Sequence, residues 1–68
     1  MDFALQSYYA NYFQCGSNDS EVIIDFGQLF EGEDRPLYNV RIITSRRYAM
    51  ELIDVLRENL AATSTPRE

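Results

Sequence analysis

The sequence lacks the residues from which most catalytic and metal sites are built. Its 68 residues include no histidine and no lysine, and Cys15 is the single cysteine. One cysteine excludes an intramolecular disulfide, and without histidine it cannot form a structural zinc site. Acid–base chemistry would have to rest on carboxylates, tyrosines and arginines, and no paired set of them is evident. We therefore expect no catalytic residues, no metal and no cofactor.

Long apolar runs and positive charge are also scarce. No run of 18 apolar residues is present, which argues against a transmembrane helix. The start, Met1 to Leu5, lacks the basic residues and long apolar core of a signal peptide. The net charge of −5 opposes binding to nucleic acid or an anionic membrane, because phosphates attract Lys and Arg. An unpaired Cys15 suits a reducing compartment, so we expect a cytoplasmic protein.

What the chain does have is apolar and aromatic content in a short length. Hydrophobic residues make up 46% of it, including five Tyr and four Phe, which indicates a folded domain. Domains below ~70–80 residues commonly need disulfides, a metal or oligomerisation to be stable. The first two are excluded by residue counts, which leaves oligomerisation.

The residue pattern predicts the order β-β-β-α. Strands are expected over residues 7–15, 21–29 and 37–44, separated by turn formers and by an acidic loop. A helix is expected from Ser45, a good N-cap residue. Its apolar stripe has the spacing i, i+3, i+4, i+7, i+11 and consists of Ala49, Leu52, Ile53, Leu56 and Leu60. We predict an α+β domain over residues 1–62, a three-stranded antiparallel sheet with one C-terminal helix packed on one face, and a frayed polar tail over 63–68.

One helix can cover only one face of that sheet, yet the predicted strands carry apolar residues on both. The helix is expected on the face that bears Val22, Ile24, Phe26, Tyr38, Val40 and Ile42. The second face would then expose Tyr9, Phe13, Ile23, Leu37 and Ile43. Scattered exposed apolar residues are normal, but a contiguous patch of this size is rarely left in water. We favour a patch through which the chain pairs with itself as a homodimer or with a larger protein.

The helix start offers an alternative function. Because the helix dipole is positive there, acidic residues are preferred, yet Arg46 and Arg47 follow Ser45. Free N–H groups and two guanidinium groups would suit a phosphate or carboxylate, so the alternative is an anion- or nucleotide-binding regulatory protein. The structural interpretation, to which we give more weight, is that these arginines pair with the acidic loop residues Glu31, Glu33 and Asp34 in the same chain or in a partner.

Two further residues have predicted structural roles. Arg41 is expected to pair with Asp25 across neighbouring strands, which contributes ~0.2–1 kcal/mol. Gly27 is expected to end the regular ladder or to mark a bulge. The triplet from Asp25 to Gly27 also spells the magnesium-binding motif of protein kinases, but this chain is too short for a kinase and has no lysine.

Short motifs along the chain resemble those of a known family of short prokaryotic proteins. They are Tyr9-Ala10-Asn11, Ile24-Asp25-Phe26-Gly27, Val40-Arg41-Ile42-Ile43-Thr44-Ser45, and the helix residues Ala49, Leu52, Leu56 and Asn59. The family is catalogued as domain of unknown function 3467, and the resemblance covers residues 8–59. It implies no activity and no catalytic residues. Members often have Pro where this chain has Arg46; both patterns signal a helix start, but the double-Arg turn is then particular to this protein.

Overall fold

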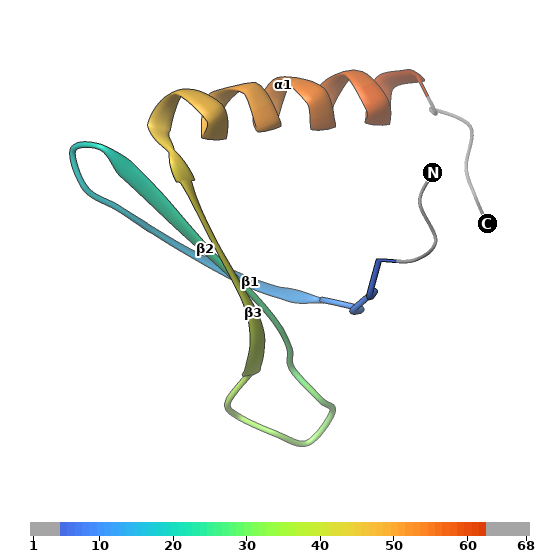
Figure 1. Cartoon of the computed structure of the whole chain (residues 1–68). Helices are drawn as coiled ribbons and strands as arrows, with labels where there is room; N and C mark the ends of the chain where they lie inside the picture. Colours follow the sequence, from blue (N-terminus) through green and yellow to red (C-terminus); the bar gives the residue numbers. More distant parts are fainter. Residues whose placement is uncertain (1–4, 63–68) are drawn as a thin grey trace.

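The computed structural model describes residues 5–62, which form a three-stranded antiparallel sheet followed by one helix (Figure 1). The strands lie side by side in the order β1-β2-β3. The predicted α+β class and strand meander are confirmed. The predicted tail over 63–68 and the first four residues lie outside the described part. The elements are β1 (Tyr12–Ser17), β2 (Glu21–Gln28), β3 (Leu37–Ser45) and α1 (Arg46–Ala62).

Strand β1 lies further along the chain than predicted. It covers Tyr12–Ser17 instead of 7–15, and its last two residues pair with β2. The cause is a tight turn, in which Asn18 Oδ1 accepts hydrogen bonds from the backbone N–H groups of Ser20 at 2.9 Å and Glu21 at 2.8 Å. Because this side-chain turn replaces a longer loop, the two strands stay paired almost to the hairpin tip.

Ahead of β1, the side chain of Asn11 keeps the chain beside β2. The Asn11 backbone N–H donates to the carbonyl of Gly27 at 3.0 Å. The Asn11 Oδ1 accepts the N–H of Leu29 at 2.9 Å, and its Nδ2 donates to the Leu29 carbonyl at 3.4 Å. An amide side chain thus takes over the pairing that a longer strand would have made.

A bulge interrupts the pairing of β2 with β3. Phe26 is opposite Val40 but Gly27 is opposite Tyr38, so β3 has one extra residue, Asn39. The prediction of a bulge at Gly27 is confirmed. A Cβ atom at Gly27 would collide with the backbone of Leu37 and Tyr38, so this close approach requires glycine. The extra residue also reverses the face on which the residues before it lie.

The register divides the sheet into two faces. We call the face toward α1 the inner face and the opposite one the outer face. The inner face bears Phe13, Cys15, Val22, Ile24, Phe26, Leu37, Val40 and Ile42. The outer face bears Tyr12, Gln14, Ile23, Asp25, Tyr38, Arg41 and Ile43. The predicted helix-side face is therefore right except for Tyr38, which the bulge turns outward.

The five residues predicted to form the second apolar face do not share one face. Ile23 and Ile43 lie on the outer face, whereas Phe13 and Leu37 lie on the inner face. Tyr9 precedes β1 altogether. The prediction of a single patch is wrong for two reasons. The register of β1 against β2 cannot be deduced from either strand alone, and the bulge moves Leu37 to the inner face.

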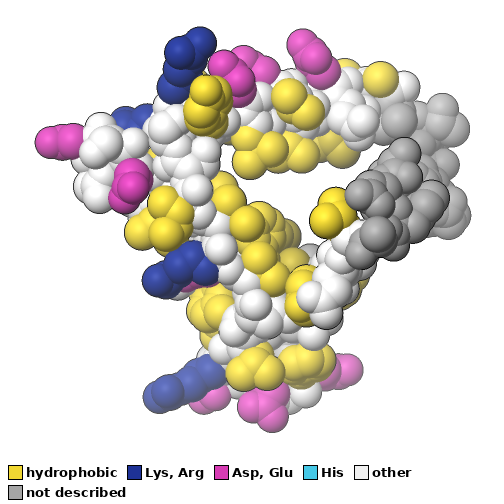
Figure 2. All heavy atoms as spheres, viewed as in Figure 1, with side chains coloured by type: hydrophobic (Ala, Val, Ile, Leu, Met, Phe, Trp, Pro, Cys, Tyr) yellow, Lys and Arg dark blue, Asp and Glu magenta, His cyan; other side chains and the backbone are white. Residues whose placement is uncertain are grey.

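The helix does not cover the inner face as predicted. It contacts the sheet near its first turns, where Ala49, Met50 and Ile53 line a hollow together with Cys15 and Val22. Beyond this point α1 diverges from the sheet (Figure 1). Figure 2 shows the open space between them, with apolar side chains along the underside of the helix and on the facing sheet. The prediction failed because β3 continues directly into α1, with no loop in which the chain could fold back.

Candidate interaction surface

Apolar side chains on the inner face and on α1 are exposed to the open space between them. Along the helix stripe, exposure rises from 41% at Leu52 to 67% at Leu60 as α1 leaves the sheet. On the sheet, Ile42 is 46% exposed, and Phe13 is exposed although its ring meets Phe26 edge-on at 5.6 Å. Among the described residues no apolar side chain is buried. Folded domains bury such side chains, so both surfaces lack a partner.

The start of α1 is fixed to the β1–β2 hairpin. Arg46 Nη1 donates to the carbonyl of Asn18 at 3.0 Å, and the Arg46 backbone N–H donates to the carbonyl of Ser20 at 3.4 Å. Ser45 Oγ accepts the backbone N–H of Tyr48 at 3.0 Å, which confirms Ser45 as the N-cap. These contacts hold the direction in which the helix leaves the sheet.

The two arginines at the helix start have different partners. Arg46 contacts the hairpin carbonyl, whereas Arg47 lies 3.7 Å from Glu51, one turn along the helix, and 5.9 Å from the ring centre of Tyr48. The acidic loop with Glu31, Glu33 and Asp34 lies between β2 and β3, at the end of the sheet opposite Ser45 (Figure 1). The prediction that these arginines pair with this loop is therefore wrong within one chain.

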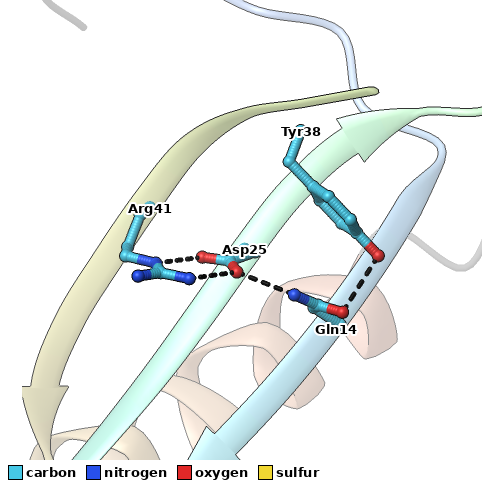
Figure 3. Close-up of polar contacts among 4 residues, drawn as sticks. All are labelled: Gln14, Asp25, Tyr38 and Arg41. Atoms are coloured by element: carbon cyan, nitrogen blue, oxygen red, sulfur yellow. Dashed lines mark hydrogen bonds and ion pairs between the residues drawn. The ribbon is translucent and has the colours of Figure 1, made fainter. Parts of the chain in front are cut away.

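A polar network crosses the outer face (Figure 3). Arg41 Nε and Nη2 donate to the two carboxylate oxygens of Asp25 at 2.7 and 2.9 Å, so the predicted pair is confirmed and is bidentate. Gln14 Nε2 donates to Asp25 Oδ2 at 2.9 Å, and the Tyr38 hydroxyl donates to Gln14 Oε1 at 3.1 Å. The network joins all three strands, and Asp25, only 5% exposed, is the one buried residue with a polar side chain in the described range.

The network sets the protonation of its members. Hydrogen bonds from Arg41, and then from Gln14, lower the pKa of Asp25 from 3.8 to about 2, against a smaller effect of burial. The same ion pair raises the pKa of Arg41. Desolvation, with smaller effects from Tyr12 and Asp25, raises the pKa of Tyr38. Asp25 is thus a charged structural group at neutral pH with its oxygens occupied.

The remaining candidate groups are the single thiol and the acidic side chains. Cys15 is a free, exposed thiol on the inner face. Within residues 5–62, no group of three or more cysteine or acidic side chains is arranged to hold a metal ion. In that same range no helix is long and apolar enough to cross a membrane.

Sequence reasoning missed three sets of hydrogen bonds that hold the strands and the helix start in place. The hydrogen bond from Arg46 to Asn18 joins residues 28 positions apart. The two hydrogen bonds between the Asn11 side chain and the Leu29 backbone join residues 18 positions apart. Polar side chains beside turns were the available signal, but their partners depend on the register. The bond from Tyr38 to Gln14 depends on the bulge.

Comparisons with known proteins place the chain in a family without assigning it an activity. Neither the curated proteins nor the solved structures include a match to it. The family model described as Protein of unknown function (DUF3467) matches residues 2–64. That match spans all four elements of the fold, and two of the motifs that suggested the family are joined by the hydrogen bond from Asn11 to Gly27. The chain belongs to the family described as Protein of unknown function (DUF3467).

Proposed function

We propose that this protein is a small interaction module without enzymatic activity, and that it works as a homodimer. One observation carries the proposal: within residues 5–62 no apolar side chain is buried, while the inner face and the helix stripe face each other across open space. The hydrophobic effect is the main favourable term in folding. Since the apolar side chains of residues 5–62 are at best partly buried, a second molecule would supply the missing contacts.

The proposed surface differs from the one predicted from the sequence. The outer face retains Ile23 and Ile43, but the network centred on Asp25 crosses between their strands and satisfies its own polar groups. The inner face bears mostly apolar side chains, and no such network crosses it in the described part of the chain. We therefore assign the association to the inner face together with the helix stripe.

The proposed absence of catalysis rests on residue types and on occupied groups. Asp25 is engaged by Arg41 and Gln14, and its lowered pKa makes it a poor proton acceptor at neutral pH. A cytoplasmic location belongs to the same proposal, since the free thiol of Cys15 suits a reducing compartment. For the alternative, an anion site at Ser45, Arg46 and Arg47, no contact of these residues favours a ligand.

Sedimentation velocity on the full chain tests the proposal. We expect a dimer at low micromolar concentration, in a buffer with reductant so that Cys15 does not form intermolecular disulfides. A stable monomer with native circular dichroism at that concentration would show that the inner face needs no partner, and the proposal would be wrong.

A further inference from the structure

The shape of the chain indicates how much surface a partner must cover. The chain exposes 6400 Å² for a mass of 7.9 kDa, whereas a compact monomer of this mass exposes about 4400 Å². The ten terminal residues, counted as a fully unfolded chain, would expose about 1650 Å², and a compact monomer of the other 58 residues would expose about 3900 Å². An excess of about 850 Å² is then left on residues 5–62. The radius of gyration is 14.4 Å, against about 11 Å for a compact domain of this length.

The excess fits a dimer interface of standard size. Two copies that each cover about 850 Å² would bury about 1700 Å² in total, close to the roughly 1600 Å² of a standard stable interface. The area is therefore sufficient for a specific dimer formed through the inner face and the helix stripe.

The chain cannot close this space by folding its own helix down. Strand β3 ends at Ser45 and α1 begins at Arg46, whereas connections between a strand and a helix usually take about 2–6 residues. The helix start is also fixed by the bonds from Arg46 to Asn18 and Ser20. We therefore assign the cover to another molecule.

A second copy has the surface that is required. Helix α1 has 17 residues and is about 25 Å long, and β2 has eight residues and is about 26 Å long. The stripe and the inner face thus match in length and in apolar character. In a two-fold dimer each chain contributes both surfaces, so one association would cover both helix stripes and both inner faces.

We infer that two copies exchange their helices, so that the stripe of α1 in each chain packs against the inner face of the other. This inference rests on the proposed homodimer and specifies which surfaces of the two chains are in contact. We place the two helices perpendicular to the two-fold axis and close to it, where the symmetry makes them antiparallel. The end of one helix then approaches the start of the other. Leu60 of one chain should then lie near Cys15 of its partner.

Cysteine crosslinking between two distinguishable chains tests the exchange. Cys15 and Ile53 of the same chain line one hollow at the start of the helix, and Leu60 is two turns further on than Ile53, about 10 Å along the helix axis. One chain retains Cys15 alone, and a second, longer by a tag, carries Cys15→Ser and Leu60→Cys. The chains are unfolded together, refolded as mixed dimers and treated with a short bismaleimide.

A matched control places the sheet cysteine on the outer face. It replaces the first chain by one with Cys15→Ser and Ile43→Cys, since Ile43 is 57% exposed on that face. Circular dichroism checks that each variant keeps its helix. We expect the mixed product from Cys15 to exceed that from the control at least fivefold, with the crosslinked peptide identified by mass spectrometry.

The possible outcomes separate the inference from the proposed function. A dimer in which the outer-face control crosslinks as well as Cys15, or better, would overturn the helix exchange and leave the homodimer standing. A dimer without any mixed product would also overturn the exchange. A monomer in sedimentation would overturn both.

Discussion

The two faces of one small sheet are completed in different ways. On the outer face, Asp25 gathers Arg41 and Gln14 around its carboxylate, and Tyr38 closes the network. Every buried side-chain nitrogen or oxygen in the described range has a hydrogen-bond partner. On the inner face most side chains are apolar, and the helix that was expected to cover them diverges from the sheet after its first turns.

The difference shows which part of the fold a single chain can complete. Polar groups find partners across neighbouring strands, because a network of four residues needs only the sheet itself. An apolar face needs a second layer, and the direct junction of β3 with α1 prevents the chain from supplying it. One chain thus completes the outer face by itself, and we propose that two chains are needed to complete the inner face.

The largest expected effect comes from a charge on the inner face. Ile42→Glu should weaken association by roughly 100-fold or more, because an unpaired buried charge costs several kcal/mol and each 1.4 kcal/mol is about tenfold. Ile43→Glu is the matched control, since this neighbour is similarly exposed but lies on the outer face. Sedimentation at equal concentrations compares the two. Equal weakening by both variants would contradict the distinction between the faces.

The second effect concerns the bulge that turns Tyr38 toward the network. Gly27→Ala should destabilise the protein by about 1–3 kcal/mol, the usual range for overpacking, because its Cβ would collide with the backbone of Leu37 and Tyr38. Gly16→Ala is the control, since nothing lies within 4 Å of a Cβ there. Urea unfolding at one fixed protein concentration measures both. A neutral Gly27→Ala would mean that the strands need not approach so closely.

The third effect is a pH dependence that belongs to the outer face. The pKa of Asp25 is about 2 in the folded state, against an ordinary value of 3.8 for this side chain. Folding therefore favours its ionised form. This contribution is present above about pH 4 and is lost as the pH falls toward 2. The free energy of unfolding of Asp25→Asn should therefore be lower than that of the unmodified protein at pH 6, and the difference should shrink below pH 4. A difference that stays constant from pH 6 to 2 would contradict the assigned role.

The smallest effect concerns the cap that begins α1. Ser45→Ala should cost about 1 kcal/mol, because Ser45 Oγ accepts the N–H of Tyr48. Ser45→Asn, which retains a capping oxygen, should be close to the unmodified protein. Thermal unfolding by circular dichroism at 222 nm compares them. If alanine and asparagine behave alike, the cap contributes little to holding the helix.

Local patterns in the sequence were enough for most of the fold. The turn formers and the alternation of β2 and β3 predicted both strands to within a residue, and Ser45 marked the helix start. The pair of Asp25 with Arg41 followed from their positions on neighbouring strands. These features depend on residues close in sequence or directly opposite one another.

The errors arose where one part of the chain depends on another. The bulge at Gly27 could be anticipated, but its effect on the facing of Leu37 and Tyr38 depends on which strand holds the extra residue. The helix stripe predicted that α1 packs on the apolar inner face. It did not reveal that the partner surface would be out of reach, because that depends on the angle at which β3 passes into α1.

The most direct test of the central claim is the thermal midpoint measured across protein concentrations. If folding requires a second copy, unfolding is also dissociation, and the midpoint must rise with concentration. For an unfolding enthalpy of about 0.7 kcal/mol per residue, a hundredfold increase should raise the midpoint of the dimer by roughly 10 °C. A midpoint that does not change over this range would show that one chain folds alone, and would contradict the account.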